Sequence, residues 1–269
     1  MYIIKFAIIP ALALISFGYH QLPVQENAKT IEERMAKVND TLYIGKTEVS
    51  NEQYARFVTE RPQQSWLRPD SAKWSVYPEG HLLTEHYFSH NSYKGYPVVA
   101  VTHEAAMEYC KWLTEVYMAD PKRKFKKVRF ALPSHAEWKF AAHAGKPENI
   151  YPFGNRLWYR TGEGMAMFRV IGDYQISFDS STQKYVVLAS NIEHDDVPAT
   201  YTAPVYSFWP NPFGIYNQSG NVAEMVLEKG IAAGGCYNDP GYDVRIVSVK
   251  HYDAPSAEIG FRVAMYIQQ

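Results

Sequence analysis

Apolar residues recur with helical spacing in three segments of the first half of the chain. After Ser50, the side chains of Tyr54, Phe57 and Val58 fall on one face, as in an amphipathic helix. Similar segments follow Thr102 and Ser134. A serine or threonine at such a position can accept a hydrogen bond from the free N–H groups of the first turn. The pattern therefore predicts three helices, each with an N-terminal cap.

Two of these helix starts carry a reciprocal capping signal. Gln53 stands three residues after Ser50, and Glu137 stands three residues after Ser134, which is the capping-box spacing. Gly145 is placed to terminate the third helix. The apolar positions expected to face inward from the second helix are Ala106, Tyr109, Cys110, Leu113 and Tyr117.

The helical period disappears after residue 146. Turn sequences (PFG at 152–154, NPFG at 211–214, SGN at 219–221 and DPG at 239–241) separate short predicted strands such as 185–188 and 244–249. Another short strand, 42–44, precedes the first helix. Early helices followed by strands and loops argue against alternating βα units. The expected fold class is α+β, with little regular secondary structure.

The N-terminus has the pattern of an export signal. Lys5 precedes about 14 uncharged, mostly apolar residues, a run too short to span a bilayer and interrupted by Pro10. Ser16 and Gly18 allow cleavage after Gly18. We predict a signal peptide over residues 1–19, a linker over 20–40 that could contain one helical turn, and one domain over 41–269. A buried N-terminal element or an uncleaved anchor are the alternatives.

Charge and cysteine content exclude several classes of protein. The 27 basic and 28 acidic side chains give a net charge of −1, which argues against nucleic-acid binding and against a polybasic membrane surface. Membrane contact is expected only through an uncleaved leader. The basic run 122–127 is interpreted as a solvated loop. Two cysteines allow at most one disulfide.

Nine short motifs occur in a fixed order between about residues 41 and 265. They lie at 47–54, 96–106, 109–112, 132–138, 151–154, 211–217, 219–224, 234–235 and 260–262. Together they resemble the sulfatase-modifying-factor family, whose founding member is the formylglycine-generating enzyme. The resemblance implies a variant of the C-type-lectin-like fold.

The resemblance does not extend to the catalytic cysteines. In the family's enzyme, two cysteines follow a Gly-Gly-Ser turn at three and eight residues past its serine, and they bind copper(I), which prefers thiolates. Here Cys236 replaces the turn serine, and the two positions fall on Asp239 and about Val244. Copper and formylglycine generation are therefore not expected. Cys236, Asp239 and Val244 could instead line a cleft, with Cys236 either filling a tight turn or acting in redox or nucleophilic chemistry, for example with His251.

The other cysteine has lost its family partner. In the family, the cysteine at the position of Cys110 often pairs with a cysteine that follows the Gly-Phe-Arg motif. In this chain that second position is Val263. We expect Cys110 to be a buried free thiol, with a bridge to Cys236 as the alternative. His86 and His90 are four residues apart, but no third metal ligand is evident.

The resemblance also implies calcium binding. Family members use an asparagine, two backbone carbonyls and a glutamate, which fall here on Asn217, Gly220, Val222 and Glu224; oxygen ligands of this kind suit Ca²⁺. The alternative is that Asn217 and Glu224 only satisfy backbone groups of the turn.

A second, tentative calcium site would use Asn191 and Ile192. Its later ligands fall near Val197 and Ala199, for which Asp195 or Asp196 could substitute after a shift.

The leading hypothesis is an exported, calcium-stabilised, non-catalytic domain of the periplasm or cell envelope. It would act in recognition or as a scaffold, like relatives in gliding motility and type IX secretion, with an envelope protein or a glycan as partner. One alternative is an oxidoreductase of the family with altered metal chemistry. The other is a formylglycine-generating enzyme that uses unrecognised residues.

Overall fold

The computed structural model describes residues 26–78, 80–171, 176–187 and 201–268. The signal peptide predicted over 1–19 and Asn191 and Ile192 of the second predicted calcium site lie outside these ranges. The helices are α1 (Ala28–Glu33), α2 (Asn51–Glu60), α3 (Gly80–His86), α4 (His103–Ala119) and α5 (His135–His143), with short 3₁₀ turns at Ser65–Leu67, Ser71–Trp74 and Asn91–Tyr93. The strands are β1 (Met35–Lys37), β2 (Leu42–Gly45), β3 (Val128–Ala131), β4 (Ile176–Asp179), β5 (Lys184–Val187), β6 (Ala223–Met225), β7 (Ile231–Ala233), β8 (Val249–His251), β9 (Ile259–Phe261) and β10 (Ala264–Ile267).

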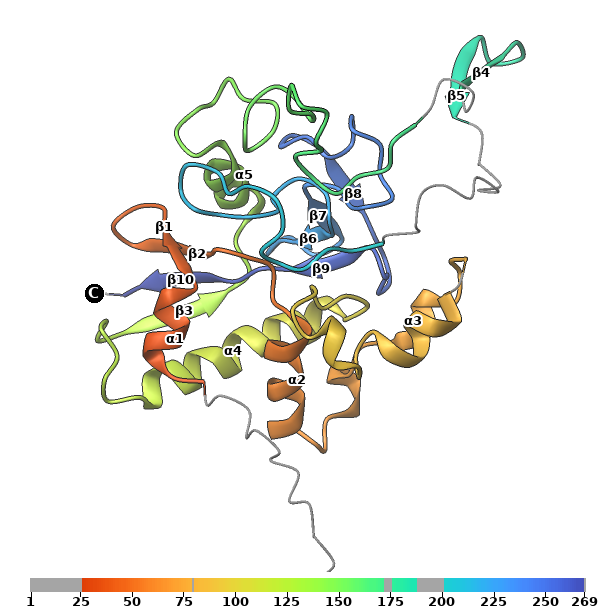
Figure 1. Ribbon diagram of the computed structural model, residues 1–269. Coiled ribbons are helices and arrows are strands. Elements are labelled where there is room, and N and C mark those ends of the chain that lie inside the picture. The colour runs from red at the N-terminus through yellow and green to blue at the C-terminus, as the bar shows by residue number, and fades with distance from the viewer. Residues whose placement is uncertain (1–25, 79, 172–175, 188–200, 269) are drawn as a thin grey trace, which may run out of the picture.

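Two small sheets organise the fold. The first has the order β1-β2-β10-β3 and is antiparallel throughout, so the last strand of the chain lies between β2 and β3. The second has the order β8-β7-β6-β9, in which β6 and β9 run parallel. Strands β4 and β5 form a separate hairpin. The α+β class is confirmed, and long loops link the short elements (Figure 1).

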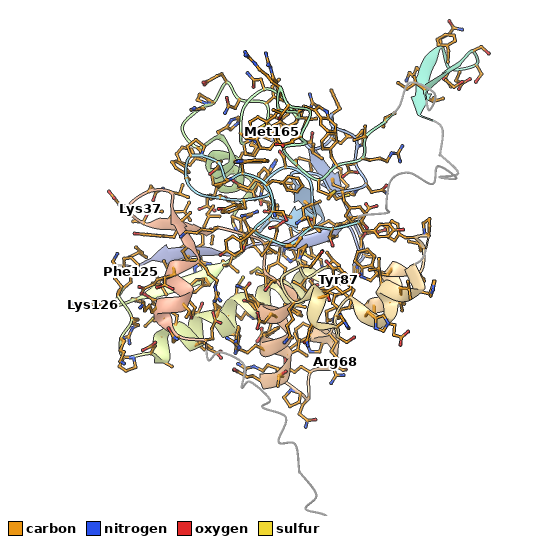
Figure 2. The ribbon with its side chains drawn as sticks, in the orientation of Figure 1. Lys37, Arg68, Tyr87, Phe125, Lys126 and Met165 are labelled. Carbon is orange, nitrogen blue, oxygen red and sulfur yellow. The ribbon has the colours of Figure 1, made fainter. Side chains whose placement is uncertain are left out.

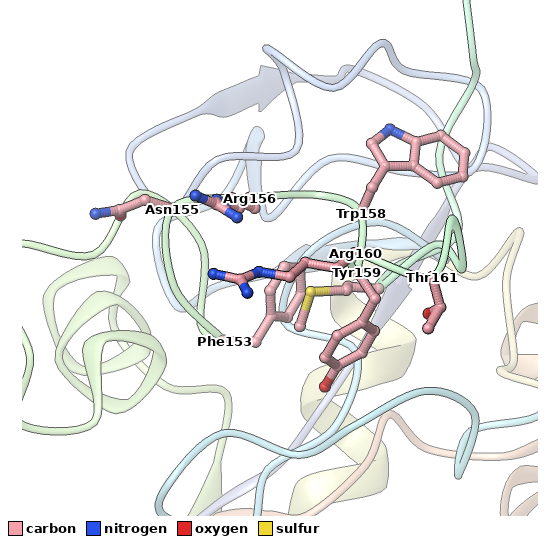
Figure 3. A pocket seen from close by; sticks show the side chains of 8 residues that line it. Phe153, Asn155, Arg156, Trp158, Tyr159, Arg160 and Thr161 are labelled. Atoms are coloured by element: carbon pink, nitrogen blue, oxygen red, sulfur yellow. The ribbon is translucent and has the colours of Figure 1, made fainter.

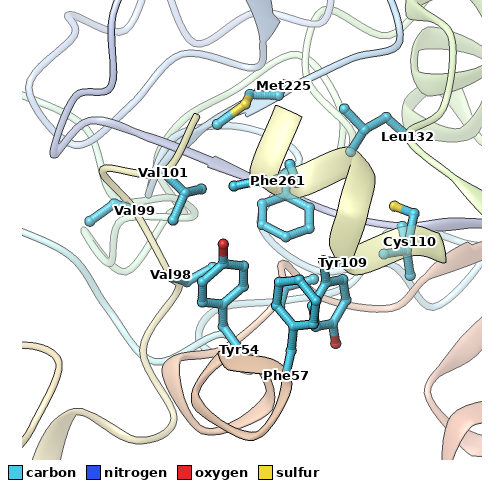
Figure 4. Close-up of a cluster of buried hydrophobic side chains, with 14 of the residues drawn as sticks. Tyr54, Phe57, Val98, Val99, Val101, Tyr109, Cys110, Leu132, Met225 and Phe261 are labelled. Carbon is cyan, nitrogen blue, oxygen red and sulfur yellow. The ribbon is translucent and has the colours of Figure 1, made fainter. Parts of the chain in front are cut away.

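The core is an aromatic cluster between helices and sheets. Tyr54 and Phe57 of α2, Tyr109 of α4 and Phe261 of β9 are all buried and face one another (Figure 4). The Tyr109 ring centroid lies 5.8 Å from that of Tyr54 and 5.5 Å from that of Phe57, within the range of favourable aromatic pairs. The inward faces predicted for α2 and α4 are therefore confirmed.

The predicted caps form. The Ser50 and Ser134 hydroxyls accept the N–H groups of Gln53 and Glu137, and both capping boxes are complete. Thr102 caps α4. After α5, Ala144 adopts a left-handed conformation and Gly145 has a φ of 79°, so this helix ends where the sequence predicted.

Within the segment predicted as a linker (20–40), residues 28–37 form α1 and β1, which pack onto the rest of the domain. Ala28 and Ile31 are buried, and the Ala28 N–H donates to Asp120 Oδ2 at 2.8 Å. Strand β1 pairs with β2. A six-residue helix is too short to show a hydrophobic period, and contacts with a segment 92 residues away hold it in place.

The strand predicted over 244–249 is also wrong, because the strand in this region is β8, Val249–His251. Val244 and Ile246 are buried alternately, as in a strand, but their backbone groups bond to loops. The Val244 carbonyl accepts the Ser219 hydroxyl, and the Ile246 N–H donates to Ile150 O. The strand predicted over 185–188 corresponds to β5.

In the described ranges, no helix is both long and apolar enough to cross a bilayer.

Candidate functional site

A tight turn after β7 brings the three predicted cleft residues together. Gly235 has a φ of 64°, and a Cβ added there would lie 2.5 Å from the Asp243 carbonyl oxygen and 2.9 Å from Val244 Cγ1. The Cys236 N–H donates to Asp239 Oδ2 at 2.9 Å. Cys236 and Val244 are fully buried. The turn therefore leaves no room for a side chain at position 235 and holds Cys236 against Asp239.

A lysine that the sequence did not single out lies beside this turn. Lys250 Nζ, from β8, lies 2.8 Å from Asp239 Oδ1, 2.6 Å from Glu258 Oε2 and 3.4 Å from Cys236 Sγ. Tyr77 donates its hydroxyl to the other oxygen of Glu258 at 2.9 Å. We call Tyr77, Cys236, Asp239, Lys250 and Glu258 the Lys250 cluster.

Charges in the Lys250 cluster are matched and partly shielded from water. Burial opposes the charge on Lys250, but the carboxylates of Asp239 and Glu258 raise its pKa above the usual value. Burial likewise opposes the charge on Glu258, yet the hydrogen bond and charge of Lys250 hold the pKa of that carboxyl below its usual value. Burial, reinforced by the two carboxylates, raises the pKa of the Cys236 thiol. Cys236 is therefore a protonated thiol, which is a poor nucleophile.

The thiol and carboxylates of the cluster are arranged like the ligands of a metal ion, but they surround the Lys250 ammonium. Cys236 Sγ and carboxylate oxygens of Asp239 and Glu258 lie within 4.8 Å of one another, and a thiol with two carboxylates could serve a divalent transition metal. The Lys250 ammonium lies within hydrogen-bond distance of all three. It already supplies the positive charge that these groups require.

Glu224, a predicted calcium ligand, is engaged by protein groups. It is fully buried on β6, and Arg262 pairs with both carboxylate oxygens. The Trp138 indole N–H also donates to Oε2, at 2.6 Å. Both oxygens therefore have strong protein partners.

Asn217, the other predicted side-chain ligand, retains a free oxygen. Its amide nitrogen donates to Glu48 Oε2 at 3.2 Å and to Val205 O at 3.0 Å, whereas Oδ1 is buried without a hydrogen-bond partner. Gly220, with a φ of 72°, and the buried Val222 lie in the turn that leads to Glu224. The side chains thus fit a calcium ligand set in part: Asn217 has an oxygen to give, while Glu224 is shared with an arginine.

Glu48 is a buried carboxylate that the sequence analysis missed. Its oxygens accept the amides of Asn217, and of Asn221 at 2.7 Å. Burial raises its pKa to about 8, Arg262 opposes the shift and Glu224 adds to it. Glu48 lies in the TEVSN sequence that begins the motif at 47–54, and this membership was the signal by which the sequence could have identified it.

The remaining candidates have structural surroundings. Cys110 is a free buried thiol on α4, its pKa raised by burial, and Cys236 is also free, so the alternative bridge between them is absent. The rings of His86 and His90 lie 6.0 Å apart. No described group of three metal-binding side chains includes either histidine. The basic run 122–127 forms the turn between α4 and β3.

The amino-acid sequence is similar to those of known proteins. The family model of the sulfatase-modifying factor enzyme 1-like domain matches residues 10–267. The formylglycine-generating enzyme of Mus musculus is 30% identical over 163 residues, which are 61% of this chain and 34% of that protein. The enzyme of Thermomonospora curvata is 28% identical over 165 residues, 61% of this chain and 41% of that protein. This chain thus matches well under half the length of these relatives.

Solved structures share the fold at low sequence identity. PvdO from Pseudomonas aeruginosa superposes with a TM-score of 0.53 and 19% identity, over 84% of this chain and 80% of that chain. Treponema denticola variable protein 1 superposes with a TM-score of 0.51 and 16% identity, over 87% of this chain and 91% of that chain. Similarity at this level indicates a shared fold alone.

Proposed function

Because the chain belongs to the family of sulfatase-modifying factor enzyme 1-like domains, we propose that it is a non-catalytic, recognition member of that family. One observation carries the proposal. Asp239 and Val244 stand where the resemblance places the copper-binding cysteines, and Asp239 is paired with Lys250 while Val244 is buried. An ion pair and an aliphatic side chain cannot form the two-thiolate site that copper(I) prefers.

The test is turnover of a sulfatase-type peptide. The purified protein, supplied with copper(I) and oxygen, is incubated with a Cys-x-Pro-x-Arg peptide, and the products are analysed by mass spectrometry. We expect no aldehyde product, while a formylglycine-generating enzyme run in parallel converts the peptide. Conversion by this chain would refute the non-catalytic role.

We also propose that the protein works in the periplasm or cell envelope, after export by the leader at residues 1–19. The support is the charge and hydropathy pattern of the leader. Mass spectrometry of the mature N-terminus, with fractionation of the producing cell, tests this placement. Cross-linking in the intact envelope would then identify a partner protein, or a glycan if no protein is captured.

A second candidate function is an oxidoreductase with altered metal chemistry. The donor set of Cys236, Asp239 and Glu258, within 4.8 Å of one another, is the observation that favours it. Elemental analysis of the protein as purified separates the two candidates. Iron or copper near one equivalent would favour the oxidoreductase. A protein that contains neither iron nor copper would favour the recognition domain, in which the Lys250 ammonium balances the charge of the cluster.

Calcium is proposed as a stabilising ion at the turn 217–224. The unpartnered oxygen of Asn217 supports the proposal, because a buried amide oxygen without a hydrogen bond is costly and a cation would satisfy it. Calcium would stabilise the turn and would supply no reaction chemistry.

A further inference from the structure

A pocket on the loop after α5 lies outside every site described above. It has a volume of about 450 Å³, within the usual range for small-molecule sites. It is formed by residues 153–165, a stretch without helix or strand. The side chains that matter for its chemistry are Phe153, Arg156, Trp158, Tyr159, Arg160 and Met165 (Figure 3).

Large aromatic side chains are partly exposed at this pocket. Trp158 is 44% exposed and Tyr159 is 38% exposed. Trp209, itself 45% exposed, supports Tyr159 with ring centroids 4.9 Å apart. Met165 is buried and is one of the residues that line the pocket. Large aromatic rings left in water at the edge of a concave site are typical of binding surfaces.

Two arginines supply unbalanced positive charge. Arg156 and Arg160 are exposed and form no ion pair or side-chain hydrogen bond with the described residues. Their guanidinium groups extend to the same side of the pocket in Figure 3. Glu163 is the one acidic residue in the segment 153–165, and it forms no ion pair within the described chain. The pocket therefore offers two planar groups suited to a carboxylate or sulfate.

We propose that this pocket binds an acidic saccharide. Trp158 and Tyr159 extend in different directions (Figure 3), so the apolar face of one pyranose ring of an oligosaccharide would pack on Trp158 and that of another on Tyr159. The carboxylate or sulfate would accept hydrogen bonds from Arg156 and Arg160. No helix begins among the lining residues, so the backbone N–H groups that commonly hold a nucleotide phosphate are lacking. The inference deepens the recognition role proposed above by naming its ligand class, and it rests on that role.

Binding is measured by calorimetry and by quenching of tryptophan fluorescence. The probes are trigalacturonic acid with its full methyl ester, and a sulfated lactose with lactose itself. We expect both acids to bind, both neutral forms to bind at least about tenfold more weakly, and added salt to weaken only the acids. Arg156→Gln and Arg160→Gln should each cost about tenfold in affinity for the acids, and Trp158→Ala should weaken acid and neutral forms together.

Arg68→Gln and Trp66→Ala are the matched controls. Both residues are exposed, and Arg68 lies at the opposite end of the molecule from Met165 (Figure 2); their replacement should leave affinity unchanged. The proposal is overturned if neither acid binds at millimolar concentration, if the neutral forms bind equally well, or if the arginine variants match wild type. These binding outcomes say nothing about aldehyde formation from the sulfatase-type peptide. The non-catalytic role is therefore tested independently of the saccharide site.

Discussion

At the residue scale, one lysine decides the character of the Lys250 cluster. Asp239 and Glu258 are only 19% and 15% exposed at their side chains. Two carboxylates so placed would repel each other without a cation between them. Lys250 supplies that cation and also lies next to Cys236 Sγ. Lys250 therefore balances the charge of the two carboxylates.

Replacing Lys250 by methionine should strongly destabilise the fold. Lys250→Met keeps much of the side-chain volume but leaves Asp239 and Glu258 without their counter-charge, at a cost of about 2–4 kcal/mol in the free energy of unfolding. Urea denaturation measures it. Lys229→Met is the matched control, because Lys229 pairs with Glu104 on the exposed surface; its cost should stay below about 1 kcal/mol. Equal losses in the two variants would contradict the role given to the cluster.

Glu48 should make stability depend on pH. Its pKa is about 8 in the folded protein and near 4.5 when free, so the folded state holds a proton that the unfolded chain releases. The free energy of unfolding should therefore fall as pH rises from about 4.5 to 8, by a few kcal/mol at most. Glu48→Gln cannot lose a proton and should remove this slope.

The measurement for Glu48 is urea denaturation of both proteins at pH 5, 7 and 9. Glu48→Gln should gain stability relative to wild type as the pH rises. Parallel pH profiles for the two proteins would show that Glu48 is already ionised in the folded state at neutral pH.

At the element scale, the turn after β7 depends on glycine for space as well as for conformation. Gly162 and Gly235 both have positive φ, 89° and 64°. A Cβ at position 162 would meet nothing within 4 Å, whereas a Cβ at 235 would overlap the Asp243 carbonyl. The two glycines therefore separate backbone strain from steric overlap.

Gly235→Ala should destabilise the protein much more than Gly162→Ala. The change at 162 carries only the left-handed backbone penalty, about 1–2 kcal/mol. The change at 235 adds an overlap that forces the turn apart, and we expect a total above about 3 kcal/mol. Thermal and urea denaturation compare the variants. A Gly235→Ala protein as stable as Gly162→Ala would mean that the turn can move freely.

At the scale of the whole molecule, calcium should raise the stability of the domain as a unit. Excess calcium stabilises the folded state by an amount set by its concentration relative to the dissociation constant, about 2.7 kcal/mol at a hundredfold excess. A chelator should therefore lower the melting temperature. Asn217→Gly keeps the positive φ of 55° but removes the free oxygen, and its melting temperature should not respond to the chelator.

Glu224 is a poorer probe of calcium than Asn217. Replacing it would leave Arg262 buried without its carboxylate, which destabilises the protein whether or not calcium is present. The change in melting temperature on chelation is therefore the quantity to compare, with magnesium added back as a control for charge screening. A wild-type melting curve unchanged by chelator would end the calcium proposal.

Local patterns along the chain determined the parts of the fold in which each residue's partners are close in sequence. Ser50, Thr102 and Ser134 cap helices because their hydroxyls bond to N–H groups three residues away. The change from helical periodicity to short strands and turns along the chain indicated the α+β class. These features need only local geometry, so the sequence alone was sufficient to predict them.

Only the tertiary structure decided the contacts between distant segments. Lys250 reaches Asp239 from 11 residues away, and Tyr77 reaches Glu258 from 181. Helix α1 is too short to show a helical period in the sequence, and its first residue is held by a hydrogen bond to Asp120. The buried charge pairs and the free oxygen of Asn217 have the same origin. Their energies depend on burial and on separations of a few ångströms, and sequence spacing does not encode either quantity.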